Sequence, residues 1–343
     1  MIIDAHLHTT GRETPADVLA SLDGAQIDLG VLLAPFLSEG YSLDDSESLE
    51  RANAFLGRLV KGQGDRLVGF AVVDPREPGA PDMLRRAVEQ HGLKGVKMVP
   101  TGWYPHEDRV QPVFAVASEL KLPVLFHSGI FIDGRSGRFC RPAYFEVMRD
   151  HPGARVALAH CGWPWTDEAI AVALIDRIHG VPEDRCAFRL DISFGPPPPY
   201  RRELLARALE VIGAGLLQFG SDCFLPCSAG HIRERMDWVR ALFDELQLDA
   251  DTSQRIWSGT ASAWLGDACP PALRGGPPQA ASPVPAPDER GETGEGGQGG
   301  DPTTAQPRPD GRVGRQAEPA FHPSWRHGAG WLLGGRGWSP LCC

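Results

Sequence analysis

The chain has 343 residues, 42% of them hydrophobic, and a formal net charge of −10 at pH 7. This length allows one large domain or two ordinary ones with a substantial core. Nucleic-acid binding needs clustered Lys and Arg, so the acidic balance, with arginines scattered among acids, argues against that class of partner. No stretch approaches 18 uncharged apolar residues, so no membrane span is predicted.

The eight cysteines are spread through the chain without a CxxC pair. Disulfide frameworks belong mainly to small secreted domains. The N-terminal sequence MIIDAHLHTT has neither the basic segment nor the long apolar run of a secretory leader. We therefore expect free thiols in a reducing compartment and a cytoplasmic protein.

Short apolar or β-branched runs alternate with longer segments of helical period. The candidate strands are residues 2–8, 29–35, 67–73, 95–99, 123–127, 155–160, 188–193 and 216–221. A strand followed by a helix, eight times over, implies a parallel sheet with right-handed crossovers. Eight such units in about 250 residues favour a closed (β/α)₈ TIM barrel over an open sheet. No GxGxxG follows the first strand, so the dinucleotide-binding alternative lacks its fingerprint.

The segments between the strands carry signals of helices. Thr14 and Pro15 are typical of a helix start, and Asp17 stands where a capping box needs its acid. Residues 200–212 place apolar side chains on one face and charged side chains on the other, and residues 232–246 repeat this pattern. These helices would cover the outside of the barrel.

The composition changes abruptly near Cys269. Residues 270–343 are dense in Pro, Gly and charge and poor in aliphatic side chains, and they cannot bury enough surface to offset their conformational entropy. We expect a disordered C-terminal tail at 270–343 after a barrel domain at 1–269. About 270 residues is within the usual size of a TIM barrel.

Polar side chains stand where several of the predicted strands end. His6 and His8 end the first strand, His127 the fifth and His160 the sixth, while Asp222 follows the eighth. Active sites of TIM barrels lie at these carboxyl ends. His6 and His8 share one face because strand side chains alternate. A lone histidine at a strand end is more often a hydrogen-bonding residue, but this set supplies ligands for Zn²⁺ or a similar divalent ion.

Four motifs carry a family resemblance. They are DAHLH at 4–8, PVLFH at 123–127, AHCG at 159–162 and FGSD at 219–222. In order and spacing, over residues 1–267, the chain resembles the metal-dependent amidohydrolase superfamily. It is most similar to the amidohydrolase-related branch, which includes aminocarboxymuconate-semialdehyde decarboxylase. The resemblance implies that His6, His8, His127 and Asp222 bind one metal ion, usually zinc, and that His160 is the acid/base.

Two features depart from the family pattern or qualify it. Lys97 ends the fourth strand, where two-metal members use a carbamylated lysine as a bridge; we favour a lysine that gives countercharge or support. Residues 256–261 read IWSGTA, where relatives usually carry an Asn-Ala pair. The loop after the fifth strand also holds Arg135, Arg138 and Arg141, which could bind a substrate carboxylate or could be ordinary solvated charges.

Three functions remain open. The leading expectation is hydrolysis of a small amide, lactone or similar carbonyl compound, with a metal-activated water, Asp222 as proton acceptor and His160 as proton donor. The alternative is non-oxidative decarboxylation of a small unsaturated or aromatic acid at the same site. The third is a catalytically silent barrel that acts as a binding protein. The partner is a small molecule in each case, and the sequence does not decide between a monomer and a homo-oligomer.

Overall fold

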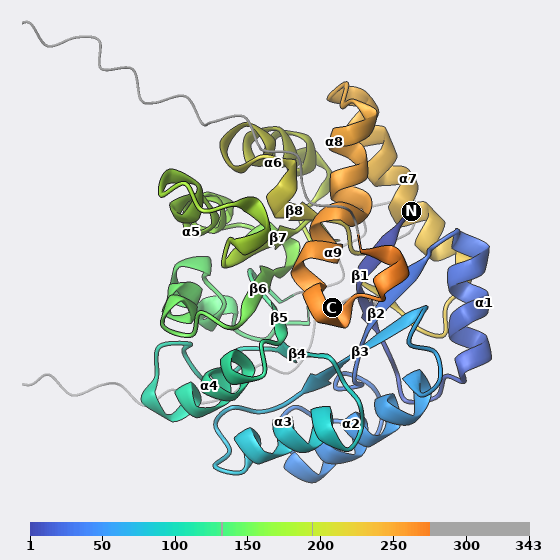
Figure 1. The fold of residues 1–343 in the computed structure, drawn as a ribbon, viewed down its shortest axis with the longest axis vertical. Helices are drawn as coiled ribbons and strands as arrows, with labels where there is room; N and C mark the ends of the chain where they lie inside the picture. The colour runs from blue at the N-terminus through green and yellow to red at the C-terminus, as the bar shows by residue number, and fades with distance from the viewer. Residues whose placement is uncertain (132, 194, 275–343) are drawn as a thin grey trace, which may run out of the picture. The chain divides into compact units, whose positions relative to one another are not determined.

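The computed structural model describes residues 1–274 except 132 and 194. Parallel strands form one sheet at the centre, surrounded by helices (Figure 1). The strands are β1 (Ile3–His8), β2 (Leu29–Leu33), β3 (Leu67–Val72), β4 (Gly95–Met98), β5 (Pro123–Phe126), β6 (Arg155–Leu158), β7 (Phe188–Asp191), β8 (Leu217–Gln218) and β9 (Cys223–Phe224). Each pairs in parallel with the next along the chain from β1 to β8.

The sheet closes through β8 and β9, which are two pieces of one run of chain. β8 pairs with β7, and β9 pairs with β1. Between the two pieces, the Ala5 amide donates to the Phe219 carbonyl at 3.1 Å and the Asp222 amide donates to the His6 carbonyl at 2.9 Å. This run is the eighth barrel strand, so the predicted TIM barrel is confirmed. The prediction of an unbroken strand at 216–221 is wrong, because the chain turns between β8 and β9.

The helices form the outer layer (Figure 1). They are α1 (Pro15–Ala25), α2 (Ser46–Val60), α3 (Ala80–Glu89), α4 (Gln111–Glu119), α5 (Thr166–Ile178), α6 (Pro198–Ile212), α7 (Ala229–Glu245), α8 (Ala250–Gln254) and α9 (Thr260–Leu265). A 3₁₀ segment, Pro142–Asp150, stands between β5 and β6. The capping box at Thr14 and Asp17 is present as predicted, with both reciprocal hydrogen bonds formed.

The last helix covers the amino-terminal end of the barrel. Trp264 of α9 is fully buried, and its indole Nε1 donates to the carbonyl of Arg155, the first residue of β6, at 2.9 Å. The Arg155 Nε donates back to the Trp264 carbonyl at 2.6 Å. The indole also contacts Phe70 of β3 at 5.2 Å between ring centroids. The candidate ligands lie at the opposite end of the barrel, which is formed by the carboxyl ends of the strands.

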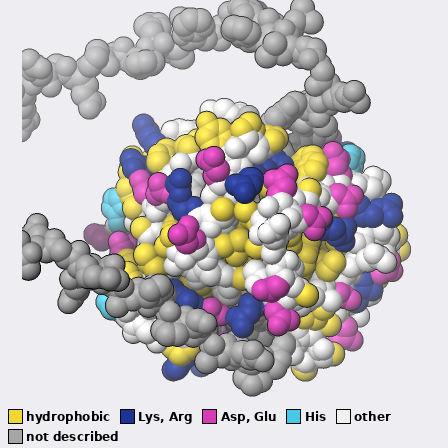
Figure 2. Space-filling model, turned by 90° about the horizontal axis from the view of Figure 1, so that it is seen from above, with side chains coloured by type: hydrophobic (Ala, Val, Ile, Leu, Met, Phe, Trp, Pro, Cys, Tyr) yellow, Lys and Arg dark blue, Asp and Glu magenta, His cyan; other side chains and the backbone are white. Residues whose placement is uncertain are grey.

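Figure 2 shows acidic and basic groups interspersed over the face that it draws. Among residues 1–274, no helix is long and apolar enough to cross a bilayer. The six cysteines of that part of the chain are free thiols, as expected; Cys342 and Cys343 lie outside the described residues.

The described structure continues five residues past the predicted end of the barrel domain. The Ser262 hydroxyl donates to the Leu273 carbonyl at 3.3 Å. Arg274 donates to the carbonyls of Cys269 at 2.9 Å and Asp267 at 3.1 Å. The predicted tail otherwise lies outside the described residues.

We predict that a chain ending at Arg274 keeps the fold and its metal, because every helix and strand given above ends before that residue. A chain ending at Cys269 loses the hydrogen bonds to 270–274 and should melt roughly 2–4 °C lower. Calorimetry and elemental analysis of both chains test this. A fall of more than about 10 °C for the longer chain would show that residues 275–343 support the barrel.

Candidate active site

His6 and His8 face the inside of the barrel because they alternate with outward side chains along β1. Both are buried, with 0% and 4% of their surface exposed. Leu7, between them, approaches Gly30 of β2 from the helix side, as Leu22 of α1 does. The sequence prediction about the two faces of this strand is therefore confirmed.

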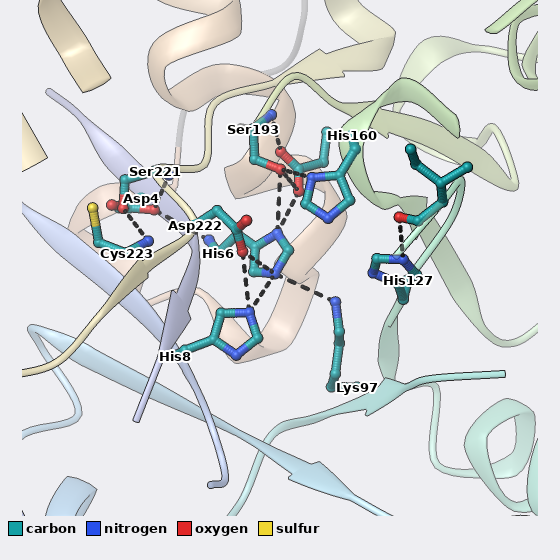
Figure 3. Close-up of polar contacts among 12 residues, drawn as sticks. Asp4, His6, His8, Lys97, His127, His160, Ser193, Ser221, Asp222 and Cys223 are labelled. Atoms are coloured by element: carbon teal, nitrogen blue, oxygen red, sulfur yellow. Dashed lines mark hydrogen bonds and ion pairs between the residues drawn. The ribbon is translucent and has the colours of Figure 1, made fainter. Parts of the chain in front are cut away.

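Three of the predicted metal ligands converge (Figure 3). His6 Nε2 lies 3.2 Å from His8 Nε2, and Asp222 Oδ1 lies 3.2 Å from His6 Nε2 and 3.1 Å from His8 Nε2. We call His6, His8 and Asp222 the ligand trio. It is the one group of this kind found within the described residues. Asp222 reaches the trio from the turn between β8 and β9.

The trio fits a divalent cation. Ligand atoms that share one ion at about 2.0–2.2 Å stand roughly 3–3.5 Å apart, which is the spacing found here. Asp222 Oδ2 is buried and accepts no hydrogen bond within the part of the chain described. Oδ1 of the same carboxylate faces the two imidazole nitrogens. A buried carboxylate with an unpartnered oxygen is costly, and a cation bound by the trio would offset that cost.

His127 does not join the trio in this structure. It follows β5 and is buried. Its Nε2 donates a hydrogen bond to the Ile130 carbonyl oxygen at 3.2 Å (Figure 3). Its ring stacks on Phe131 at 4.0 Å and stands 5.2 Å from the ring of His160, between centroids. The side chain thus lies on the same wall of the barrel mouth as His160, and its role as a fourth ligand stays a prediction.

Lys97 of β4 lies beside the trio. It is 1% exposed, and its Nζ donates to His6 Nε2 at 3.3 Å. Burial lowers the pKa of His6 well below its usual value, and the neighbouring Lys97 charge lowers it further. Burial also lowers the pKa of His8 and of His127. These imidazoles are therefore neutral at pH 7, the state in which they can bind a metal.

Two residues that sequence reasoning missed hold the histidines in place. Asp191 ends β7, and its Oδ2 accepts from His6 Nδ1 at 2.7 Å and from the Ser193 hydroxyl at 2.9 Å. Ser193 Oγ in turn lies 3.0 Å from His160 Nδ1, so a hydrogen-bond chain joins His160 to His6. Burial raises the pKa of Asp191 to about 7. Asp191 and Ser193 stand two positions apart at the end of a predicted strand, so their side chains should share a face. This spacing was the signal that could have revealed them.

A third residue that sequence reasoning missed, Asp4, supports the segment that carries Asp222. Its Oδ1 accepts from the Ser221 amide at 2.9 Å and from the His6 amide at 3.2 Å. Burial raises the pKa of Asp4 to about 7. The carboxyl group therefore joins the start of β1 to the segment before Asp222, and thereby sets the distance between the trio's members.

The backbone is strained at the residues that carry two of the functional side chains, His160 and Asp222. His160, Cys161 and Asp222 have φ of 58°, 48° and 57°, in the left-handed region. The predicted strand at 155–160 ends earlier, at Leu158, and residues Ala159–Gly162 form a tight turn instead. Such conformations cost about 1–3 kcal/mol for a residue other than glycine, and they persist where the surrounding structure enforces them. The turn places the His160 ring 5.5 Å from the His6 ring, between centroids.

We predict that Asp191→Asn weakens metal affinity by roughly 10- to 100-fold, because a carboxylate behind a ligating imidazole fixes its tautomer and raises its basicity. Competition with a chromophoric chelator measures this affinity. Ser193→Ala is the matched control, since it leaves the bond from His6 to Asp191 intact. Equal affinities of the wild type and of Asp191→Asn would refute the role given to Asp191.

Solved structures share this architecture. The chain is similar to an uncharacterised TIM-barrel protein from Bordetella bronchiseptica, with 19% identity, 78% of this chain and 99% of that one covered, and a TM-score of 0.57. It is similar to 2,6-dihydroxybenzoate decarboxylase from Rhizobium (16% identity, 77% and 98% covered, TM-score 0.55). It is also similar to 5-carboxyvanillate decarboxylase from Novosphingobium aromaticivorans with bound manganese (18% identity, 72% and 80% covered, TM-score 0.51). At these identities the likeness concerns the fold.

The family is established by the sequence itself. A search of the curated proteins gave no match. The model of the family described as Amidohydrolase matches residues 3–266, which contain the ligand trio, Lys97 and His160. The resemblance drawn from the strand-end motifs is thereby confirmed, and the chain belongs to the amidohydrolase family.

Proposed function

We propose that the protein is a metal-dependent, non-oxidative decarboxylase of a small aromatic or unsaturated carboxylic acid. The observation that carries this is the position of His160, whose ring lies beside the ligand trio and is held from behind by Ser193. Two of the similar structures given above are decarboxylases of aromatic acids, and they favour this alternative over the hydrolysis expected first.

The chain's own residues can supply the proton that the reaction needs. Ser193 and Asp191 hold a proton at His160 Nδ1, so Nε2 is the nitrogen that exchanges a proton with substrate. His160 adds this proton to the carbon that bears the carboxylate. The bond from that carbon to the carboxyl carbon then breaks, its electron pair restores the conjugated system, and CO₂ leaves.

The trio and its neighbours would hold the acid for this step. When bound by His6, His8 and Asp222, with His127 as the predicted fourth ligand, a divalent ion supplies positive charge for the oxygen atoms of the substrate. Zinc was the expected ion; the manganese in the Novosphingobium structure makes manganese a second candidate. Lys97 adds a further positive charge beside His6. The buried surroundings of the trio strengthen each of these interactions.

Hydrolysis remains a second candidate because of Asp222. Its Oδ2 is buried beside the trio without a hydrogen-bond partner in the described chain, and it could take a proton from an attacking water. His160 would then protonate the leaving group of an amide or lactone.

A paired assay separates these functions. The protein, loaded with Mn²⁺ or Zn²⁺, is incubated with 2,6-dihydroxybenzoate, 5-carboxyvanillate and related hydroxybenzoates while CO₂ is measured, and in parallel with a panel of esters, lactones and amides. We expect CO₂ release that depends on metal and is lost in His160→Asn. Turnover of the carbonyl panel without CO₂ would replace the proposal with hydrolysis. A fully metal-loaded protein inert on both panels would point to a binding protein.

A further inference from the structure

Two phenylalanines pack against the ring of His8, a member of the ligand trio. The Phe224 ring stacks on the imidazole, with 4.5 Å between the centroids and an angle of 7° between the two planes. The Phe36 ring lies 5.4 Å from the imidazole, between centroids, and is tilted by 54°. His8 and Phe36 are buried, and Phe224 is half-buried. The His8 ring therefore has an aromatic neighbour in parallel contact and a second one at an angle.

The two phenylalanines come from the two strands on either side of β1. Phe224 belongs to β9 and is the register partner of His8, so both side chains stand on the inner face of the sheet. Phe36 follows β2, which pairs with the other edge of β1. The Leu225 amide donates to the His8 carbonyl at 2.8 Å. The backbone of β9 thereby fixes Phe224 relative to His8.

His8 differs from His6 in how its ring is held. Both polar contacts of the His8 ring use Nε2, one with His6 and one with Asp222, and its Nδ1 makes no hydrogen bond within the described part of the chain (Figure 3). The His6 Nδ1, by contrast, donates to Asp191 at 2.7 Å. A histidine that binds a metal usually donates its other N–H to a neighbouring group, and this bond fixes the plane of the ring. For His8, the chain supplies packing in place of that bond.

The stacked ring is sufficient to fix this plane. The torsion that rotates an imidazole about its Cβ–Cγ bond has a broad minimum, so a ring without a partner at Nδ1 could turn at little cost. A parallel ring at 4.5 Å removes this freedom, because a turned His8 ring would collide with Phe224. A ligand that is already oriented loses less entropy when it binds an ion. The contact with Phe224 should therefore raise the affinity of the trio for metal.

One short segment thus supplies a ligand and also supports the other two. Asp222 enters the trio directly, and its amide donates to the His6 carbonyl at 2.9 Å. Phe224, two residues later, stacks on His8. Because one segment carries both Asp222 and Phe224, the positions of the Asp222 carboxylate and of the His8 ring are set together.

We propose that Phe224 is a positioning residue of the metal site. Its ring holds the imidazole of His8 in the plane in which Nε2 faces His6 and Asp222, and Phe36 limits rotation of the same imidazole from the side of β2. The inference concerns the metal site and not the reaction, so it applies equally to a decarboxylase, a hydrolase or a binding protein.

Competition with a chromophoric chelator tests this role on the full-length protein, with Co²⁺ as the probe. Phe224→Leu and Phe224→Met keep apolar volume but have no planar face. Each should weaken Co²⁺ binding by roughly 3- to 10-fold, the range expected for the loss of one aromatic contact. Each should also change the visible absorption spectrum of bound Co²⁺, which depends on the arrangement of its ligands. Phe224→Tyr keeps the ring and should match the wild type within about twofold in affinity, with an unchanged spectrum.

Phe139→Leu is the matched control. Phe139 is a buried ring after β5 that contacts Tyr104 and Arg138, and none of its ring contacts within the described residues involves the trio. This variant should keep both the affinity and the spectrum of the wild type. Phe36→Leu should weaken Co²⁺ binding in the same direction as Phe224→Leu but by a smaller factor, since its ring is tilted. Melting temperatures of the metal-free proteins check that each variant is folded.

Three results would overturn the positioning role. They are wild-type affinity and spectrum in both Phe224→Leu and Phe224→Met, a loss in Phe224→Tyr as large as in Phe224→Leu, and an equal loss in Phe139→Leu. A wild type that binds no Co²⁺ would refute the trio and this role together. CO₂ release is not part of the measurement, so failure of the decarboxylase proposal would leave the outcome unchanged.

Discussion

Replacing His160 with Asn should lower turnover by roughly 10²–10⁴-fold while metal content stays near that of the wild type. The side chain stands outside the ligand trio and its Nδ1 is bound to Ser193, which is the arrangement of a proton donor positioned from behind. Asn tolerates the left-handed backbone at this position, so the fold should be kept. Steady-state kinetics and elemental analysis of the same preparation measure both quantities.

Ser193→Ala and Lys97→Ala distinguish a proton-donating His160 from a metal-binding or structural one. Ser193→Ala should reduce turnover less than His160→Asn and shift the pH at which activity changes, because Ser193 acts on substrate only through His160. A two-metal site would behave differently: His160→Asn and Lys97→Ala would each remove about one equivalent of metal. If neither metal nor turnover responds to His160→Asn, the histidine is structural and the mechanism proposed above is wrong.

The largest effect on metal is expected from the double variant His6→Ala/His8→Ala, which should bind no divalent ion at all. It leaves Asp222 as the only member of the trio, and one carboxylate does not hold zinc or manganese in competition with water. Elemental analysis after dialysis against trace metal measures the loss. Activity in either assay should fall to background in the same sample.

Two single variants accompany the double variant, one as a control and one as a test of the fourth ligand. His231→Ala removes an imidazole exposed on α7 and should keep full metal content. His127→Ala tests the fourth ligand: a metal-loaded protein in which His127 turns from the Ile130 carbonyl to the ion should lose affinity by more than tenfold on this change. Full metal retention in the double variant would refute the trio as the metal site.

The order of elements could be read from the sequence because each strand is a short apolar run followed by a helical period. Seven of the eight predicted strands appear within one or two residues of their predicted ends. The eighth was not predictable in detail. Phe219–Asp222 bonds to β1 residues more than 200 positions away, and these contacts, not local propensity, decide where the strand turns.

The candidate site was predictable where it depends on a strand's own alternation and not where it depends on tertiary partners. His6 and His8 share a face by the geometry of one strand. By contrast, the bond of Asp191 to His6 spans 185 positions, and the direction of the His127 ring is set by Ile130 and Phe131. No repeating pattern in the sequence predicts these contacts.

The left-handed turns at His160 and Asp222 have a consequence for laboratory evolution. Glycine or asparagine would relieve the strain at either position, by about 1–2 kcal/mol for each residue. A library screened for heat resistance alone should therefore collect replacements at these two positions, and the most heat-resistant clones should be inactive. Only a screen that also demands turnover would keep His160 and Asp222, and the divergence between the two screens would single out these residues without knowledge of the substrate.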